Sequence, residues 1–277
     1  MIRFLLAVIA LYVLVLLLLF IFQRKLIYLP SRGSEAAMQA TAEMLHLTPW
    51  RDAGGSIIGW KKATTPGAIK PANRLIVFHG NAGFALARSH FVTGFGNLGG
   101  GTLWDVHLFE YPGFGARPGP LGEKTFVQAA RAAIAQLTAE DRRPIFLLGE
   151  SLGSGPACAL AGAEPDSIAG LLLITPYRSL AEVAQHHYPI VPVRLLLRDR
   201  WENTPALQRF HRRVAFLLAS DDEVIPVTQG RQLFESANEP KRLWVAPGAT
   251  HNRLPYEIRA PWWREVSDFL LNPKPEG

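Results

Sequence analysis

Ser151 lies at the centre of a Gly-x-Ser-x-Gly pentapeptide, Gly149-Glu150-Ser151-Leu152-Gly153. An apolar run from Pro144 to Leu148 precedes it, and small residues that can begin a helix follow it. A serine on such a tight strand-to-helix turn exposes its hydroxyl, and Gly149 and Gly153 remove side chains that would clash where helix and strand approach. The pentapeptide is frequent by chance, so the competing interpretation is an ordinary glycine-rich turn with a capping serine. The flanking strand and helix favour a nucleophile.

The other groups that a nucleophilic serine needs follow later apolar runs. The run Val214–Leu218 leads to Asp221, Asp222 and Glu223, and the next apolar run leads to His251. A histidine can take the serine proton and return it to a leaving group, while a carboxylate fixes the histidine tautomer. The order serine, acid, histidine, each just after a strand, is one established order for such a triad. Spacing alone leaves three carboxylates competing for the role of the acid.

A small-residue loop, His79-Gly80-Asn81-Ala82-Gly83, follows an earlier apolar run. The tetrahedral oxygen of an acyl transfer needs two N–H donors. We expect one from Leu152, directly after the serine, and the other from Asn81 or the residue after it. His79 precedes the serine and lies within the loop, so we expect it, with Gly80, to support the loop rather than to act as the base.

The rest of the chain predicts the elements that position these residues. Short apolar runs alternate with amphipathic segments, which indicates an α/β fold with a mostly parallel central sheet and helices on both faces. The predicted strands are 56–61, 74–78, 105–110, 144–148, 168–174, 214–219 and 241–245, and the predicted helices 35–45, 123–137, 153–163, 228–235 and 262–271. Residues 176–212 interrupt the alternation and are a candidate cap, with Tyr177, Tyr188 and Trp201 compatible with an apolar pocket or with core packing.

The N-terminus carries an unbroken apolar run from Phe4 to Phe22. As a helix it would be about 28 Å long, which matches a hydrocarbon core of about 30 Å. A cleaved signal peptide is the alternative, but no small-residue cleavage site follows the run. We therefore expect a single-pass membrane anchor over residues 1–24 and one domain over 25–277. Basic residues flank both ends, Arg3 before the run and Arg24 with Lys25 after it, and favour only slightly a cytoplasmic domain.

The charge and the cysteine content of the chain limit the partners and cofactors that we expect. The net charge of +6 comes from scattered basic residues without a basic run, so we expect no nucleic-acid partner and, at most, attraction to anionic lipid. The single cysteine, Cys158, excludes an intramolecular disulfide and a zinc–cysteine cluster, and its small-residue surroundings indicate a packed thiol. We expect neither a metal nor another cofactor.

These motifs together resemble the α/β-hydrolase superfamily, in particular its single-pass, membrane-anchored ABHD-type branch of serine hydrolases. The resemblance rests on segments spread over the chain: Gln23 to Pro30, His79 to Gly83, Tyr111 to Gly115, the elbow that carries the serine (Gly149 to Gly153), Thr175 to Leu180, Ala219 to Pro226, and Gly248 to Asn252. It implies Asp222 as the catalytic carboxylate. The chain departs from the family at Glu110 and Pro112, where an aspartate and an arginine are usual, which puts the support of the 79–83 loop in question.

The resemblance implies a serine hydrolase that cleaves esters or thioesters with an apolar acyl chain, near membrane lipid. A peptidase of the aminopeptidase-like type is the alternative, for which acidic side chains in the cap would hold a substrate amine; Glu182 and Glu202 are the candidates there. A non-catalytic binding module would be expected to lack a triad residue, and none is missing.

Overall fold

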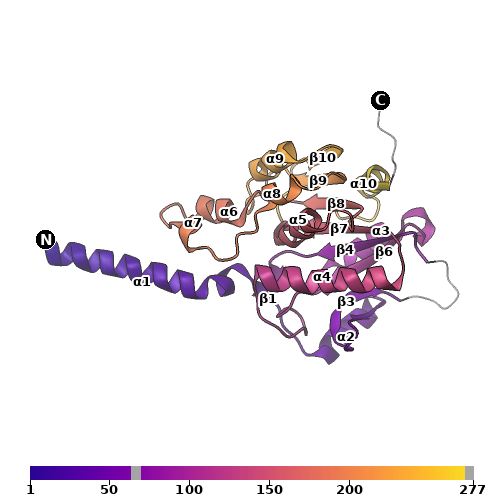
Figure 1. The fold of residues 1–277 in the computed structure, drawn as a ribbon, viewed down its shortest axis with the longest axis horizontal. Helices are drawn as coiled ribbons and strands as arrows, with labels where there is room; N and C mark the ends of the chain where they lie inside the picture. Colours follow the sequence, from indigo (N-terminus) through magenta and orange to yellow (C-terminus); the bar gives the residue numbers. More distant parts are fainter. Residues whose placement is uncertain (64–69, 272–277) are drawn as a thin grey trace.

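The computed structural model describes residues 1–63 and 70–271, and within them an eight-stranded sheet forms the centre of the molecule. Its order is β10-β9-β8-β7-β4-β6-β3-β2 (Figure 1). Only β2 and β3 run antiparallel to their neighbours, so the predicted mostly parallel sheet is confirmed. In chain order the strands are β2 (Leu47–Arg51), β3 (Ile57–Lys62), β4 (Asn73–Phe78), β6 (Trp104–Phe109), β7 (Ile145–Glu150), β8 (Gly170–Ile174), β9 (Arg213–Ala219) and β10 (Lys241–Ala246).

Helices cover both faces of this sheet, which explains why β4, β7 and β8 are buried along their whole length. One apolar layer joins the sheet to α4, α5, α8 and α9, and a second joins it to α2, α3 and α10. Figure 1 shows α4 lying across the near face of the sheet. The helices are α1 (Ile2–Ile27), α2 (Glu35–Met44), α3 (Ser89–Gly96), α4 (Glu123–Glu140), α5 (Ser154–Ala163), α6 (Leu180–His187), α7 (Val193–Leu196), α8 (Asn203–Leu207), α9 (Val227–Ser236) and α10 (Trp262–Leu271).

The parallel strands end at one edge of the sheet, and the segments singled out by the sequence all follow them there. The 79–83 loop follows β4, Ser151 follows β7, Asp222 follows β9 and His251 follows β10. Ligands and chemistry gather at the carboxyl edge of an open parallel sheet because several loops converge on it. The fold therefore brings together residues that are up to 172 positions apart in the chain.

The helix α1 extends away from the domain (Figure 1) and is long and apolar enough, by length and composition, to cross a membrane. Beyond the expected anchor boundary at residue 24, it continues to Ile27. Directly after it, the two-residue strand β1 (Leu29–Pro30) pairs in parallel with β5 (Ala82–Gly83). Residues 29–31 thus donate backbone hydrogen bonds to the 79–83 loop, from Leu29 N to Asn81 O and from Ser31 N to Gly83 O, each 2.9 Å long.

Sequence patterns missed several elements. The strand β2 was not predicted because Pro49 interrupts its pattern, and it lies at the edge of the sheet, where a missing N–H is tolerated. The short pair β1–β5 and the glycine-containing helix α3 were also not predicted. The expected domain end at residue 277 lies outside the described residues, which stop at 271.

Residues 176–212, the candidate cap, divide into two parts. Their second part packs into the domain: Trp201 is 1% exposed, and α8 lies against α5. Their first part, the hairpin of α6 and α7, contacts α1 instead: Gln23 Nε2 donates to Leu196 O and Gln23 Oε1 accepts from Arg198 N. Of the three aromatic side chains for which a pocket and core packing were both open, Tyr177 and Trp201 are buried in the core and Tyr188 is exposed.

Candidate active site

Ser151 lies on a strained turn between β7 and α5. Its φ of +53° is in the left-handed region that side chains other than glycine rarely adopt. A Cβ at Gly153 would lie 2.0 Å from Phe78 O, and one at Gly149 would lie 2.5 Å from Gly153 O. Both glycines are therefore required by close backbone contacts, and the turn presents the Ser151 hydroxyl at the carboxyl edge of the sheet.

A chain of hydrogen bonds joins three of the expected residues. Ser151 Oγ lies 2.9 Å from His251 Nε2, and His251 Nδ1 lies 2.9 and 2.8 Å from the two carboxylate oxygens of Asp222. Since Asp222 can only accept when ionised, it holds the His251 proton on Nδ1 and leaves Nε2 free to accept the serine proton. This is the geometry of a nucleophile, a base and an orienting acid.

The three competing carboxylates have different partners. Asp222 Oδ1 accepts hydrogen bonds from the amides of Val224 (3.0 Å) and Ile225 (2.7 Å), which fix its orientation toward His251. Asp221 accepts instead from the Ser220 hydroxyl, and Glu223 accepts from the backbone N–H of His251. Of the three, only Asp222 contacts the imidazole ring.

The 79–83 loop passes directly beside Ser151, because a Cβ at Gly80 would lie 3.7 Å from Ser151 Cβ. His79 is 1% exposed; its Nδ1 donates to Gly80 O at 2.8 Å, and its Nε2 lies 3.2 Å from Glu110 Oε1. Glu110 also accepts from the amide of Ala85, at the start of the next helical turn. Glu110, where the resemblance expects an aspartate, therefore contacts the first residue of this loop and a residue just beyond its end.

The two expected oxyanion donors flank Ser151. Leu152 is the next residue in the chain, and Asn81 lies in the neighbouring loop. In the described part of the chain the backbone N–H of Asn81 has no hydrogen-bond partner, while its carbonyl accepts from Leu29 N and its Nδ2 donates to Ile27 O at 3.2 Å. The Asn81 peptide is thus held from the side of α1, with its N–H left available.

One buried ion pair beneath the elbow was not anticipated from the sequence. Glu150, the residue before Ser151, pairs with Arg88 and accepts from the Tyr256 hydroxyl at 3.2 Å. Burial would raise the pKa of Glu150, but the Arg88 guanidinium more than offsets this, and the pKa lies below its usual value. A signal existed in the sequence: a glutamate that ends a fully apolar strand requires a buried cationic partner.

We expect Glu150→Gln to lower the free energy of unfolding by about 3 kcal/mol at pH 7, because it leaves the partly buried Arg88 charge unpaired. The depressed pKa sets the sign of the pH dependence. The stabilisation is fully present above the unfolded-state pKa of about 4.3 and is lost as the pH falls through the lower folded-state value. Urea unfolding of both proteins as a function of pH would measure this; a difference that stays constant into strong acid would contradict it.

Cys158 is fully buried within α5, and burial raises the pKa of its thiol, so it is a packed side chain rather than a second nucleophile. Tyr177 lies beneath the elbow as well and donates from its hydroxyl to Leu152 O at 3.3 Å. The Tyr177 hydroxyl therefore supports the turn that carries Ser151.

The sequence model described as the alpha/beta hydrolase family matches residues 75–275, nearly three quarters of the chain, a range that includes the 79–83 loop, Ser151, Asp222 and His251. The chain belongs to the alpha/beta hydrolase family. An uncharacterized protein of Mycobacterium tuberculosis is 35% identical over 237 residues, which cover 83% of this chain and 80% of that protein. The human alpha/beta hydrolase domain-containing protein 17B is 31% identical over 200 residues, covering 71% and 65% of the two chains.

Two further comparisons of this alpha/beta hydrolase concern a relative named as a membrane protein and a solved structure of the same fold. A Saccharomyces cerevisiae protein named as an uncharacterized membrane protein is 26% identical over 173 residues, 60% of each chain. Among solved structures, an esterase of Pyrococcus furiosus superposes with a TM-score of 0.63 at 16% identity, covering 88% of this chain and 97% of that one. At this identity the likeness shows the shared fold alone.

Proposed function

We propose that this alpha/beta hydrolase cleaves carboxylic esters or thioesters with Ser151 as its nucleophile, His251 as its base and Asp222 as the orienting acid. The observation that carries the proposal is the continuous hydrogen-bond chain from Asp222 through His251 to Ser151, with the serine on a strained turn. Strained backbone of this kind is retained where function requires it.

In this mechanism Ser151 Oγ attacks the acyl carbon while its proton passes to His251 Nε2. The amides of Asn81 and Leu152 stabilise the oxyanion that forms. The bond to the alcohol or thiol then breaks, the leaving group takes the proton from His251, and an ester joins the acyl group to Ser151. Water attacks this acyl-enzyme and loses a proton to His251; the bond from the acyl carbon to Ser151 Oγ then breaks, Oγ takes that proton back from His251, and the carboxylic acid is released. Gly149, Gly153, His79 and Gly80 hold the two loops in place.

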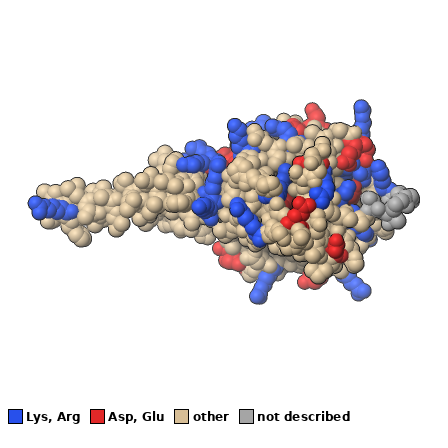
Figure 2. Space-filling model, turned by 90° about the horizontal axis from the view of Figure 1, so that it is seen from below, with Lys and Arg blue, Asp and Glu red and all other residues tan. Residues whose placement is uncertain are grey.

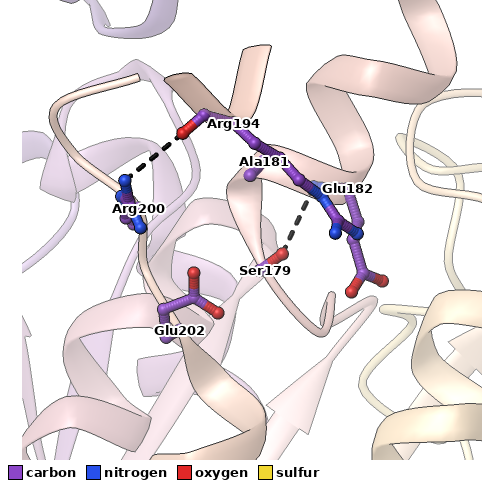
Figure 3. A pocket seen from close by; sticks show the side chains of 6 residues that line it. All are labelled: Ser179, Ala181, Glu182, Arg194, Arg200 and Glu202. Atoms are coloured by element: carbon purple, nitrogen blue, oxygen red, sulfur yellow. Dashed lines mark hydrogen bonds between the residues drawn. The ribbon is translucent and has the colours of Figure 1, made fainter. Parts of the chain in front are cut away.

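The surroundings of the acidic cap residues favour an ester over a substrate with a free amine. Glu182 and Glu202 line a polar pocket of about 260 Å³ together with Arg194 and Arg200 (Figure 3), so two acidic and two basic side chains share this lining. Glu182 also lies 3.5 Å from the Arg178 guanidinium and accepts from Gln229. A pocket without net negative charge does not attract the ammonium group of a substrate, so it gives no preference for substrates with a free amine.

The helix α1 supports a location at a membrane. Figure 2 shows Lys and Arg atoms at the free end and at the base of the projecting helix, with none between them. The apolar side chains along it are exposed, for example Leu5, Leu11 and Leu17, at 51–62%. Exposed apolar surface of this length is stable only when lipid or protein covers it, and we propose that α1 is a single-pass anchor and that membrane lipids supply the substrate.

Labelling with a fluorophosphonate tests the nucleophile. The Ser151 oxygen displaces fluoride from phosphorus, so an assembled triad is labelled covalently. We expect the full chain in lipid nanodiscs to be labelled, Ser151→Ala to remain unlabelled with kcat lowered about 10⁶-fold, and Ser167→Ala, an exposed serine outside the site, to behave as the wild type. Labelling of Ser151→Ala would show that another residue is the nucleophile, and absence of labelling in the wild type would favour a non-catalytic module.

A substrate series divides esterase from peptidase activity. We expect acyl esters and thioesters to be hydrolysed and aminoacyl amides with a free amino group to be turned over far more slowly. Faster hydrolysis of the amides would support the peptidase instead.

A further inference from the structure

An apolar groove of about 350 Å³ lies between the base of α1 and the α6–α7 hairpin. Leu19, Leu26 and Ile27 line one wall, and Ala184, Val191 and Leu196 line the other. The volume falls in the range of small-molecule sites, about 300–1,000 Å³. Gln23 also lies in the groove, but its amide donates to Phe20 O and Leu196 O and accepts from Arg198 N. Because these partners satisfy the amide, an apolar ligand in the groove would leave no hydrogen bond of Gln23 unmade.

Both walls of this groove are hydrogen-bonded to loops of the proposed active site. From the α1 side, Ile27 O accepts from Asn81 Nδ2 at 3.2 Å. From the hairpin side, His187 Nε2 donates to Val224 O at 2.8 Å, and Val224 in turn donates its N–H to Asp222. The helix and the hairpin that form the groove are therefore each bonded to a loop of the proposed active site, one to the loop that carries Asn81 and the other to the loop that carries Asp222.

The hairpin also follows α1 toward its middle. The Tyr12 hydroxyl donates to Ile190 O at 2.6 Å, and Tyr12 is ten residues from Phe22, or about 15 Å along the helix. That is about half the thickness of a hydrocarbon core. Ile190 is 79% exposed, and the hairpin also exposes Tyr188 (60%) and Leu195 (83%).

The charged side of the hairpin is separate from its apolar side. Arg194 lines the polar pocket of Figure 3, whereas Val193, Leu196 and Leu197 line the groove. The apolar side of the hairpin, which lies beside an apolar helix, is compatible with the acyl region of one leaflet. The groove then opens toward lipid chains rather than toward water.

We propose that this groove holds the hydrocarbon chain of a membrane-lipid ester or thioester while its carbonyl reaches Ser151. The proposal rests on the proposed function and adds the substrate class: a long aliphatic acyl chain that enters from the bilayer. α1 is then a wall of the binding site as well as an anchor.

A photoreactive probe tests the path on the unaltered protein. A hexadecyl fluorophosphonate with a diazirine near the end of its chain is bound to Ser151 of the full chain in phosphatidylcholine nanodiscs, irradiated, and mapped by mass spectrometry. We expect crosslinks in peptides from residues 19–27 and 184–197. Crosslinks confined to other segments of the labelled protein would overturn the groove but leave the proposed function intact, whereas failure of Ser151 to react would overturn both.

A matched pair of substitutions tests the same site by kinetics. Ala184→Trp places a large ring in the groove, and Leu195→Trp places the same ring on the exposed side of the hairpin. The readout is the ratio of Ser151 labelling rates by hexadecyl and butyl fluorophosphonates. We expect Ala184→Trp to lower the ratio about tenfold or more and Leu195→Trp to leave it unchanged. An unchanged ratio in Ala184→Trp, with butyl labelling retained, would contradict the proposal; if that variant does not fold, the crosslinks decide it.

Discussion

Asp222→Asn is expected to lower kcat for an acyl ester about 10⁴-fold while leaving the fold intact. The reason lies in how the carboxylate is held. Both backbone hydrogen bonds, from Val224 and Ile225, go to Oδ1, so an asparagine would keep its carbonyl there and turn its NH₂ group toward His251. The imidazole would then carry its proton on Nε2, where it cannot accept the proton of Ser151.

The neighbouring residue provides the control. Asp221→Asn removes the same charge one residue away, but its carboxylate accepts from Ser220 and does not contact the imidazole. We expect kcat of this variant to stay within about twofold of the wild type. Steady-state hydrolysis and fluorophosphonate labelling of both variants measure the effect. Equal losses in the two would indicate a general charge effect and reject Asp222 as the orienting acid.

Removal of residues 1–30 is expected to destabilise the domain by about 6 kcal/mol, a large share of the 5–15 kcal/mol typical of domains. Tyr28 is 1% exposed and packs edge-to-face on Phe126, with ring centroids 5.1 Å apart; the loss of such a side chain costs about 3 kcal/mol. Arg24 binds both oxygens of the buried Asp199 at 2.8 Å, and leaving that carboxylate unpaired costs about 3 kcal/mol more.

A shorter truncation separates this effect from the loss of the membrane helix itself. A chain that starts at residue 20 keeps Gln23, Arg24, Tyr28 and β1, and we expect it to unfold in detergent at nearly the temperature of the full chain. The chain that starts at residue 31 should unfold at a much lower temperature and lose fluorophosphonate labelling. Equal melting temperatures for the two truncated chains would show that residues 20–30 are only a tether.

The residues that sequence reasoning brought together share one property: each follows a strand of the parallel part of the sheet. Such strands appear as short continuous apolar runs, so their ends can be read directly, and parallel ends meet at one edge. For this reason Ser151, Asp222, His251 and the 79–83 loop could be grouped from the amino-acid sequence alone. The choice of Asp222 over Asp221 came from the family resemblance, since three adjacent carboxylates have no distinguishing spacing.

What the sequence did not reveal depends on contacts between distant segments. The ion pair of Arg88 with Glu150 joins residues 62 positions apart, and neither position shows a pattern that names its partner. The edge strand β2 contains a proline, and β1 is only two residues long, so neither has a periodicity to detect. The cap region likewise gave no sign that Trp201 belongs to the core while Ile190 is exposed.

The pairing of β1 with β5 has a consequence for the choice of substrate. Because α1 passes within two residues into a strand bonded to the loop beside Ser151, no flexible spacer separates the helix from the Ser151 hydroxyl. If α1 spans the bilayer as proposed, this connection fixes the distance of the hydroxyl from the acyl region. The enzyme would then select lipids by the depth of their scissile carbonyl below the membrane surface. A change in bilayer thickness would alter which carbonyls Ser151 can reach.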